Sequence, residues 1–222
     1  MLITVGSYVG VFFLCLWAAD FLTGIIHWAE DTYCKNGYPI IGALICEPNR
    51  LHHEDPNLMV RTGNFISRNW IQWFACGTVY GLLWLVGLGQ LPVLLTLLLA
   101  SFGNEVHYWN HTTKLGWLPT FIKTTGLVQS QKQHALHHKP PHMKYYCTLT
   151  SFLNPILELI RFWRGAEWFL EKGFNLVPVR QEVKSKLLRK TITTAKRPKI
   201  AKGKTVRIGP SKLDSGKFAS LS

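Results

Sequence analysis

The chain has 222 residues, of which 47% are hydrophobic and 13% aromatic, an apolar content that suits a membrane protein. Its net charge of +13 comes mostly from residues 178–222, which hold 13 Lys and Arg against two acidic residues, so the charge is no evidence that the fold binds nucleic acid. The five cysteines are widely spaced and form no CxxC pair, which argues against a disulfide framework or a zinc ribbon and favours free, buried thiols.

The composition changes near residue 178, where apolar residues give way to Lys, Ser, Thr, Gly and Pro. We therefore expect one domain over residues 1–177 and a basic, mostly disordered tail over residues 178–222, with at most a short helix at 180–192. Such a tail is expected to contact anionic lipid or to stay solvated rather than to bind nucleic acid.

Three apolar stretches are candidates for membrane-spanning helices. Residues 2–26 contain Asp20 as their only charge, are long enough to cross a bilayer, and lack the basic start of a cleavable signal, so we expect an uncleaved anchor. Residues 70–89 and 92–109 are the second and third candidates, and an uncharged turn joins them. Residues 28–69 between the first two are polar and rich in turn residues.

Two weaker elements follow. Residues 117–128 are mixed in character and are expected to lie along the membrane surface. Residues 155–171 predict an amphipathic interfacial helix, with Asn154 as its N-cap and Pro155 at its first position. The predicted fold class is therefore an all-α integral membrane protein with about three transmembrane helices plus interfacial helices.

All the histidines lie between residues 27 and 142. The nine are His27, His52, His53, His107, His111, His134, His137, His138 and His142. If three spans precede the last cluster, all nine reach the same face of the membrane. That face also carries most of the Lys and Arg residues, so the positive-inside rule predicts that it is cytoplasmic.

The histidine spacing predicts shared helix faces. His107 and His111 are four residues apart, and His134, His137 and His138 follow the i, i+3, i+4 pattern. Two prolines then end the helix, so that His142 approaches through a turn. Another single face of the first span carries Asp20, His27 and Asp31.

A lone histidine near a membrane surface is more often a hydrogen-bonding group than a ligand, but nine on one face indicate a metal site. The clusters contain no cysteine, and eight or nine imidazoles exceed what one ion needs, so we expect two metal ions. Oxygen chemistry requires such a cofactor, which favours a dinuclear iron site facing a lipid chain. For Asp20, a carboxylate inside a span, we expect a role in orienting an imidazole.

The histidine motifs also resemble those of a known group of enzymes. The pattern His-x-x-x-His followed by His-x-x-His-His resembles the histidine boxes of membrane fatty-acid desaturases and hydroxylases. More narrowly, residues from about 18 to 167 resemble the Kua/CarF-like lipid desaturase domain family. The matching segments are Asp20 to Trp28, Arg50 to Pro56, Asn104 to Thr112, His134 to His138 with His142, Tyr146-Cys147, Asn154 and Phe162 to Arg164.

This resemblance implies an O₂-dependent di-iron desaturase that receives electrons from a carrier such as cytochrome b5 or ferredoxin. Its substrate would be a membrane phospholipid, and the expected reaction forms the vinyl ether of plasmalogens from an alkyl ether chain. All nine histidines carry over as candidate iron ligands, and the expected supporting residues are Asp20, Asp31, Asn104 and Asn154. The five residues expected to be central to catalysis are His107, His111, His134, His137 and His138.

The expected location is a multi-pass position in the endoplasmic reticulum or the bacterial inner membrane.

Three alternatives for the function stay open at this point. The ligands alone do not separate vinyl-ether formation from desaturation of phospholipid acyl chains, or desaturation from hydroxylation on the same di-iron scaffold. A membrane metal transporter is the non-enzymatic alternative, although its ligands would be expected along a path near the bilayer midplane rather than at one face.

Overall fold

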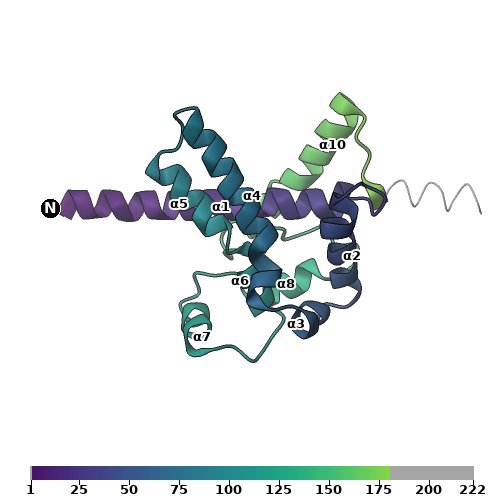
Figure 1. Ribbon diagram of the computed structural model, residues 1–222, viewed down its shortest axis with the longest axis horizontal. Coiled ribbons are helices and arrows are strands. Elements are labelled where there is room, and N and C mark those ends of the chain that lie inside the picture. Colours follow the sequence, from purple (N-terminus) through teal and green to yellow (C-terminus); the bar gives the residue numbers. More distant parts are fainter. Residues whose placement is uncertain (1, 181–222) are drawn as a thin grey trace, which may run out of the picture. The chain divides into compact units, whose positions relative to one another are not determined.

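The structure is a computed structural model that describes residues 2–180, and within that range all of its regular secondary structure is helical (Figure 1). In chain order the elements are α1 (Leu2–Tyr33), a short π-helix η1 (Gly42–Cys46), α2 (Glu47–Glu54), α3 (Leu58–Thr62), α4 (Phe65–Leu85), α5 (Leu91–Ala100), α6 (Gly103–Trp109), α7 (Trp117–Thr124), α8 (Gln131–His137), α9 (Leu153–Leu159) and α10 (Phe162–Phe174). Most of the predicted tail, including nearly all of the expected helix at 180–192, lies outside the described residues.

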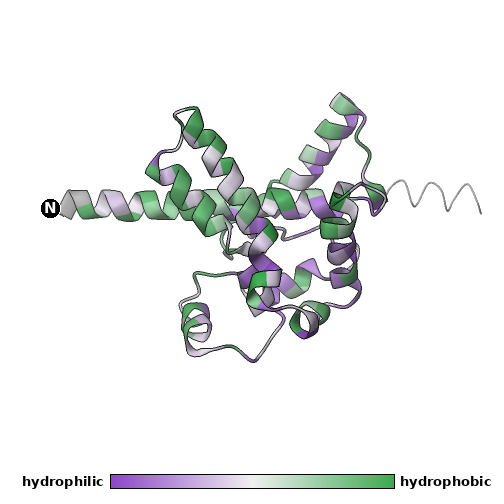
Figure 2. Ribbon diagram, in the orientation of Figure 1, coloured by the Kyte–Doolittle hydropathy of each residue, from purple (hydrophilic) through white to green (hydrophobic). Residues whose placement is uncertain are grey.

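The first expected span is confirmed as a long apolar helix. With 32 residues, α1 is about 48 Å long, and among the described residues it is the one helix long and apolar enough to cross a membrane. Apolar side chains such as Tyr8, Leu14 and Trp17 stand exposed along its N-terminal part. Figure 2 shows this apolar character continuing into α4 and α5, whereas hydrophilic residues gather around α2, α6 and α8.

The second and third expected spans take a different form. α4 begins at Phe65, five residues earlier than expected, because Asn64 and Ser67 form a capping box there. The third expected span is interrupted, since α5 ends at Ala100 and α6 begins at Gly103. The ten residues of α5 rise only about 15 Å, half of a bilayer's hydrocarbon thickness. Among the described residues, only the first of the about three expected transmembrane helices is long and apolar enough to cross a membrane, and the second and third spans stay a prediction.

The expected helix over residues 155–171 is also divided. Arg161 adopts a left-handed backbone conformation with φ of 56°, which separates α9 from α10. Asn154 is not an N-cap, because α9 begins one residue earlier and the Asn154 side chain is fully buried. The expected surface element at 117–128 is the shorter helix α7.

The prediction that all cysteines are free thiols is wrong for two of them. Cys34 and Cys46 form a disulfide, with their Cα atoms 5.3 Å apart, while Cys15, Cys76 and Cys147 are free. Their separation of twelve residues carried no motif, and only the turn between α1 and η1 brings them together. The bond connects the end of α1 to the segment that leads into α2.

One irregular segment, residues 143–150, packs along α1 and is called the strap below. Tyr146 and Cys147 of the strap join Trp28 of α1 and Trp163 of α10 in one buried cluster. A second buried cluster joins Ala19 of α1 to Leu149 of the strap, together with Ala100 and Val106. The core thus fixes the strap between α1 and the C-terminal helices.

Candidate metal centre

Eight of the nine histidines converge in two groups of potential metal ligands. The first group, called group A, consists of His52 from α2, His107 from α6, His111 just after it, His134 from α8 and His138 just after α8. Group B consists of His27 and Asp31 from α1, His53 from α2 and His137 from α8. In each group, one donor atom per residue lies within 4.8 Å of all the others.

In group A the Nε2 atoms face one another at short range. His52 Nε2 lies 2.8 Å from that of His107 and 3.1 Å from that of His138. His134 Nε2 lies 2.6 Å from that of His111 and 3.0 Å from that of His138. Two nitrogens bound at about 2.1 Å and at right angles on one metal would lie about 3.0 Å apart, so this spacing suits a common ion.

Group B adds a carboxylate to three imidazoles. Asp31 Oδ1 lies 2.9 Å from His53 Nε2, and Asp31 Oδ2 lies 3.5 Å from His137 Nε2 and 3.8 Å from His27 Nε2. Among the described residues, the buried atoms His27 Nε2, His137 Nε2 and Asp31 Oδ2 have no hydrogen-bond partner. Buried polar atoms that converge without partners are costly unless they bind something, and a cation satisfies all three.

The two groups are close neighbours. The ring of His138 in group A lies 5.1 Å from that of His53 and 5.4 Å from that of His137, measured between centroids. The ring of His107 lies 5.6 Å from that of His27. This arrangement fits two adjacent metal ions sharing one chamber.

Backbone carbonyls of the strap orient two of the group B imidazoles. His27 Nδ1 lies 3.0 Å from the carbonyl oxygen of Tyr146, and His137 Nδ1 lies 2.8 Å from that of Lys144. In each ring Nδ1–H therefore donates to a carbonyl, which leaves the lone pair of Nε2 for a metal.

The strap is itself held by buried polar side chains. The Asp20 carboxylate accepts hydrogen bonds from the backbone N–H of Leu149 at 2.8 Å and from the N–H and hydroxyl of Thr150 at 3.0 and 2.6 Å. Asp20 thus anchors the strap, and the expectation that it orients an imidazole directly is corrected. Asn154 accepts from the N–H of Cys147 and donates to its carbonyl, at 3.0 and 2.8 Å.

Burial keeps the imidazoles of His111, His134 and His138 neutral. Burial and the nearby His53 lower the pKa of His111 to about 4. Burial and the neighbouring imidazoles, His111 first, lower the pKa of His138 to about 3, and the same causes hold the pKa of His134 well below its ordinary value. Neutral rings with free lone pairs are the form that binds metal.

The remaining predicted residues lie outside the two groups. His142 follows the two prolines by a turn, and its ring stands 4.4 Å from that of His53, but it is not among the grouped donors. Asn104 donates to the carbonyl of Arg68 at 2.9 Å and so joins α6 to α4 rather than touching an imidazole.

Sequence reasoning missed three contributors. The carbonyls of Lys144 and Tyr146 are backbone groups and leave no mark in the sequence. Gly24 was not singled out, although a Cβ there would lie 2.6 Å from Cys147 Sγ, so glycine is needed where the strap crosses α1. Asp31 was predicted to share a helix face with His27 but was expected only as a supporting residue, whereas the structure groups it with the potential ligands.

These features define a class of protein: an all-helical chain with a long apolar helix and two adjacent, histidine-rich groups that can hold metal ions. Residues 16–181 match the model of the lipid desaturase domain, and the chain belongs to this family. The resemblance noted in the sequence is thereby confirmed.

Individual relatives carry desaturase names. The chain is 32% identical over 167 residues to plasmanylethanolamine desaturase 1 of Mus musculus, covering 67% of this chain and 59% of the relative. It is 26% identical over 187 residues to plasmanylethanolamine desaturase of Myxococcus xanthus, covering 80% and 66%. It is 33% identical over 173 residues to a probable fatty acid desaturase of Acanthamoeba polyphaga mimivirus, covering 74% and 82%. No solved structure matches the chain.

Proposed function

We propose that this protein is an O₂-dependent di-iron desaturase of membrane lipids. The observation that carries the proposal is the convergence of eight imidazoles and one carboxylate into two neighbouring groups, in a chain of the lipid desaturase family. Group A would hold one iron through five nitrogens, more than a four-coordinate zinc site uses. Group B would hold the second iron through His27, Asp31, His53 and His137.

Bound iron would supply the one-electron and oxygen chemistry that side chains lack. Desaturation removes two hydrogens from adjacent carbons of a lipid chain and forms a double bond. O₂ takes up those two hydrogens, two electrons from a carrier such as cytochrome b5 or ferredoxin, and two protons from solution, and so yields two waters. The protein's own task is to hold neutral imidazoles in fixed directions, and the strap does so at His27 and His137.

For the substrate, we propose an alkyl ether phospholipid that is converted into a vinyl ether. Two relatives named as plasmanylethanolamine desaturases support this choice. Desaturation of phospholipid acyl chains is the second candidate, supported by the relative named as a fatty acid desaturase, which matches at 33% identity over 82% of its length. The chain spans 59% and 66% of the two plasmanylethanolamine desaturases, so their activity enters here as a proposal.

We further propose that α1 anchors the protein in the membrane and that residues 1–177 form the desaturase domain. The apolar, exposed N-terminal part of α1 supports the anchor. The basic segment from 178 onward would serve contact with anionic lipid rather than chemistry.

Metal analysis of purified variants tests the site. The native chain is expected to hold two iron ions per chain. His107→Ala should lose the group A ion and His137→Ala the group B ion, and both should lose turnover. His142→Ala is the matched control, since it removes a neighbouring imidazole outside both groups and should keep both ions. Full activity with zinc in place of iron would refute the di-iron proposal.

Lipid mass spectrometry tests the substrate. Cells with and without the gene are compared for vinyl-ether lipids and for acyl double bonds. If vinyl-ether lipids are lost when the gene is deleted, the result supports plasmalogen formation. If only the number of acyl double bonds changes, the result supports desaturation of phospholipid acyl chains instead. Hydroxylated lipid as the sole product would refute desaturation.

A further inference from the structure

The segment between Arg68 and Glu105 is unusual in its charge. These 36 residues contain no Asp, Glu, Lys or Arg, and they comprise most of α4, a turn, α5 and the start of α6. The two charged residues that bound the segment pair with each other at 3.1 Å, and the Gln72 amide donates to the carbonyl of Ala100 at 3.0 Å. The segment is therefore a helical hairpin. Its two ends lie together, close to the histidine groups A and B, because Glu105 precedes His107 by two residues.

The surface of this hairpin suits hydrocarbon rather than water. Large apolar side chains stand exposed on both arms and on the turn, among them Val79, Leu82, Trp84, Leu85, Leu88, Leu91 and Leu98. Between the arms lies a cavity of about 340 Å³ lined almost wholly by apolar and aromatic groups, including Trp73, Leu94 and Phe102. Exposed apolar side chains in this number mark contact with a membrane or a partner, and the uncharged sequence favours lipid chains.

Side chains donate hydrogen bonds to three carbonyls in the turn between the arms and at the start of α5. The Gln90 amide donates to the carbonyl of Gly87 at 3.0 Å, and the Tyr80 hydroxyl donates to that of Gly89 at 3.1 Å. The carbonyl of Pro92 accepts from the Thr96 hydroxyl at 2.8 Å and from the Cys15 thiol at 3.5 Å. Irregular backbone inside a bilayer must be satisfied by protein groups, and these hydrogen bonds supply part of that requirement.

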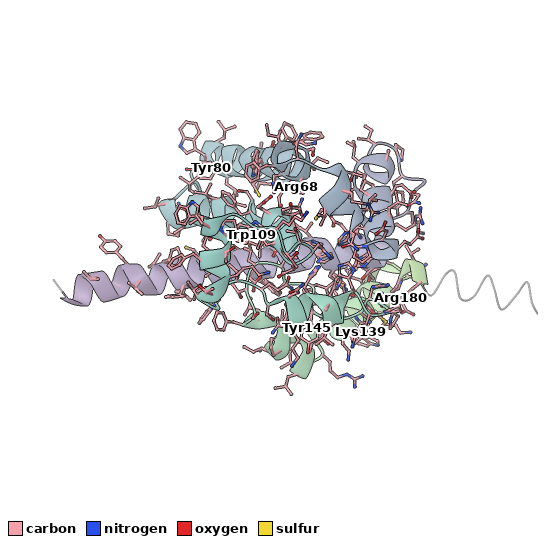
Figure 3. The ribbon with its side chains drawn as sticks, turned by 90° about the horizontal axis from the view of Figure 1, so that it is seen from below. Arg68, Tyr80, Trp109, Lys139, Tyr145 and Arg180 are labelled. Carbon is pink, nitrogen blue, oxygen red and sulfur yellow. A yellow bond between two sulfur atoms is a disulfide. The ribbon has the colours of Figure 1, made fainter. Side chains whose placement is uncertain are left out.

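The depth of the turn can be measured along α1. The contact from Cys15 to Pro92 places the start of α5 beside Cys15, which lies about 18 Å along α1 from His27. From Cys15, α1 continues for about another 20 Å toward its N-terminus. Figure 1 shows that part of α1 extending past the hairpin, and Figure 3 shows Tyr80 nearer than Arg68 to the N-terminal end of α1. A hydrocarbon layer about 30 Å thick that begins near His27 would have its midplane close to the turn.

We propose that the α4–α5 hairpin enters only one leaflet of the bilayer, from the side of the histidine chamber, and turns near the midplane. The chain then crosses the membrane once, through α1. The partner of the hairpin surface is the hydrocarbon of that single leaflet. This inference rests on the membrane location proposed above and goes beyond the catalytic function.

Cysteine labelling in sealed membrane vesicles tests the hairpin. The free thiols Cys15, Cys76 and Cys147 are first replaced by serine, and Leu88→Cys then places a probe at the turn. Lys114→Cys, on an exposed loop of the histidine side, is the matched control, and a cysteine in an N-terminal extension marks the opposite side. Each variant is checked for retention of its two metal ions before labelling.

We expect an impermeant maleimide to label the two control sites from opposite faces and to lose access to Leu88→Cys from both faces until detergent is added. A bimane attached at residue 88 should be quenched most by phosphatidylcholine brominated deep in its chains. Labelling of Leu88→Cys from the face opposite Lys114→Cys would establish a full crossing, and labelling from the same face would place the hairpin outside the bilayer. Either result overturns the proposal without touching the desaturase assignment, which lipid mass spectrometry tests separately.

Discussion

Gly24→Ala is a sharp test of how the strap supports the metal centre. The added methyl would lie 2.6 Å from Cys147 Sγ and 3.3 Å from the Cys147 backbone, so the strap would have to move away from α1. The strap resists that movement because Asn154 binds the backbone of Cys147 and Asp20 binds the two residues Leu149 and Thr150. A shift of the strap would also lengthen the hydrogen bond between His27 and the carbonyl of Tyr146.

The expected cost follows from two opposing effects. Overpacking of this kind costs about 1–3 kcal/mol, and replacing glycine within a helix returns about 1 kcal/mol. The net loss of about 0–2 kcal/mol corresponds to a melting temperature lower by up to about 8 °C for a domain of this size. Gly10→Ala, on the same helix with nothing within 4 Å of the new methyl, is the matched control and should not lose stability.

Thermal unfolding in detergent and metal analysis together decide the case. Gly24→Ala should melt below the native chain and lose metal from group B before group A. The double variant Gly24→Ala with Cys147→Ala removes the sulfur contact and should recover part of the loss. If Gly24→Ala is as stable as Gly10→Ala and keeps both ions, the strap is not tightly constrained and the reasoning fails.

Three further predictions concern supports of the same centre. Asp20→Ala leaves three buried donors of the strap without an acceptor, at about 1–3 kcal/mol each, so the melting temperature should fall sharply, and an unchanged value would contradict the anchor role. Cys34→Ser opens a disulfide with a twelve-residue separation and should cost about 3 kcal/mol in chemical denaturation, while Cys76→Ser costs little. Truncation after Arg180 should leave metal content and activity intact. Truncation after Val177 also removes the buried Pro178 and the ion pair between Arg180 and Glu167, so it should destabilise the domain. Equal stability of the two truncated chains would show that these contacts are negligible.

Composition and motif were enough to predict an all-helical chain, a long first apolar helix and a histidine-rich centre. The length of the third span was not predictable from hydropathy, because the run continues through Ser101 and Phe102 while the helix does not. The disulfide escaped prediction because its two cysteines meet through a turn that no spacing rule describes. The role of Asp20 escaped for a related reason: its partners are backbone N–H groups 129 and 130 residues away.

The division of the histidines between the two groups follows from helix geometry. Residues four apart on a helix differ by about 40° in direction, and each such pair shares a group: His27 with Asp31 in group B, and His134 with His138 in group A. His52 and His53 differ by about 100° and belong to different groups.

On α8, His137 points about 60° to one side of His134 while His138 points about 40° to the other, so this helix supplies ligands to both groups. The sequence pattern was interpreted as one shared face, but the wider spread of three residues lets a single short helix contribute donors to both groups. A change that rotates α8 should therefore disturb both groups at once, whereas a change on α6 should reach only group A.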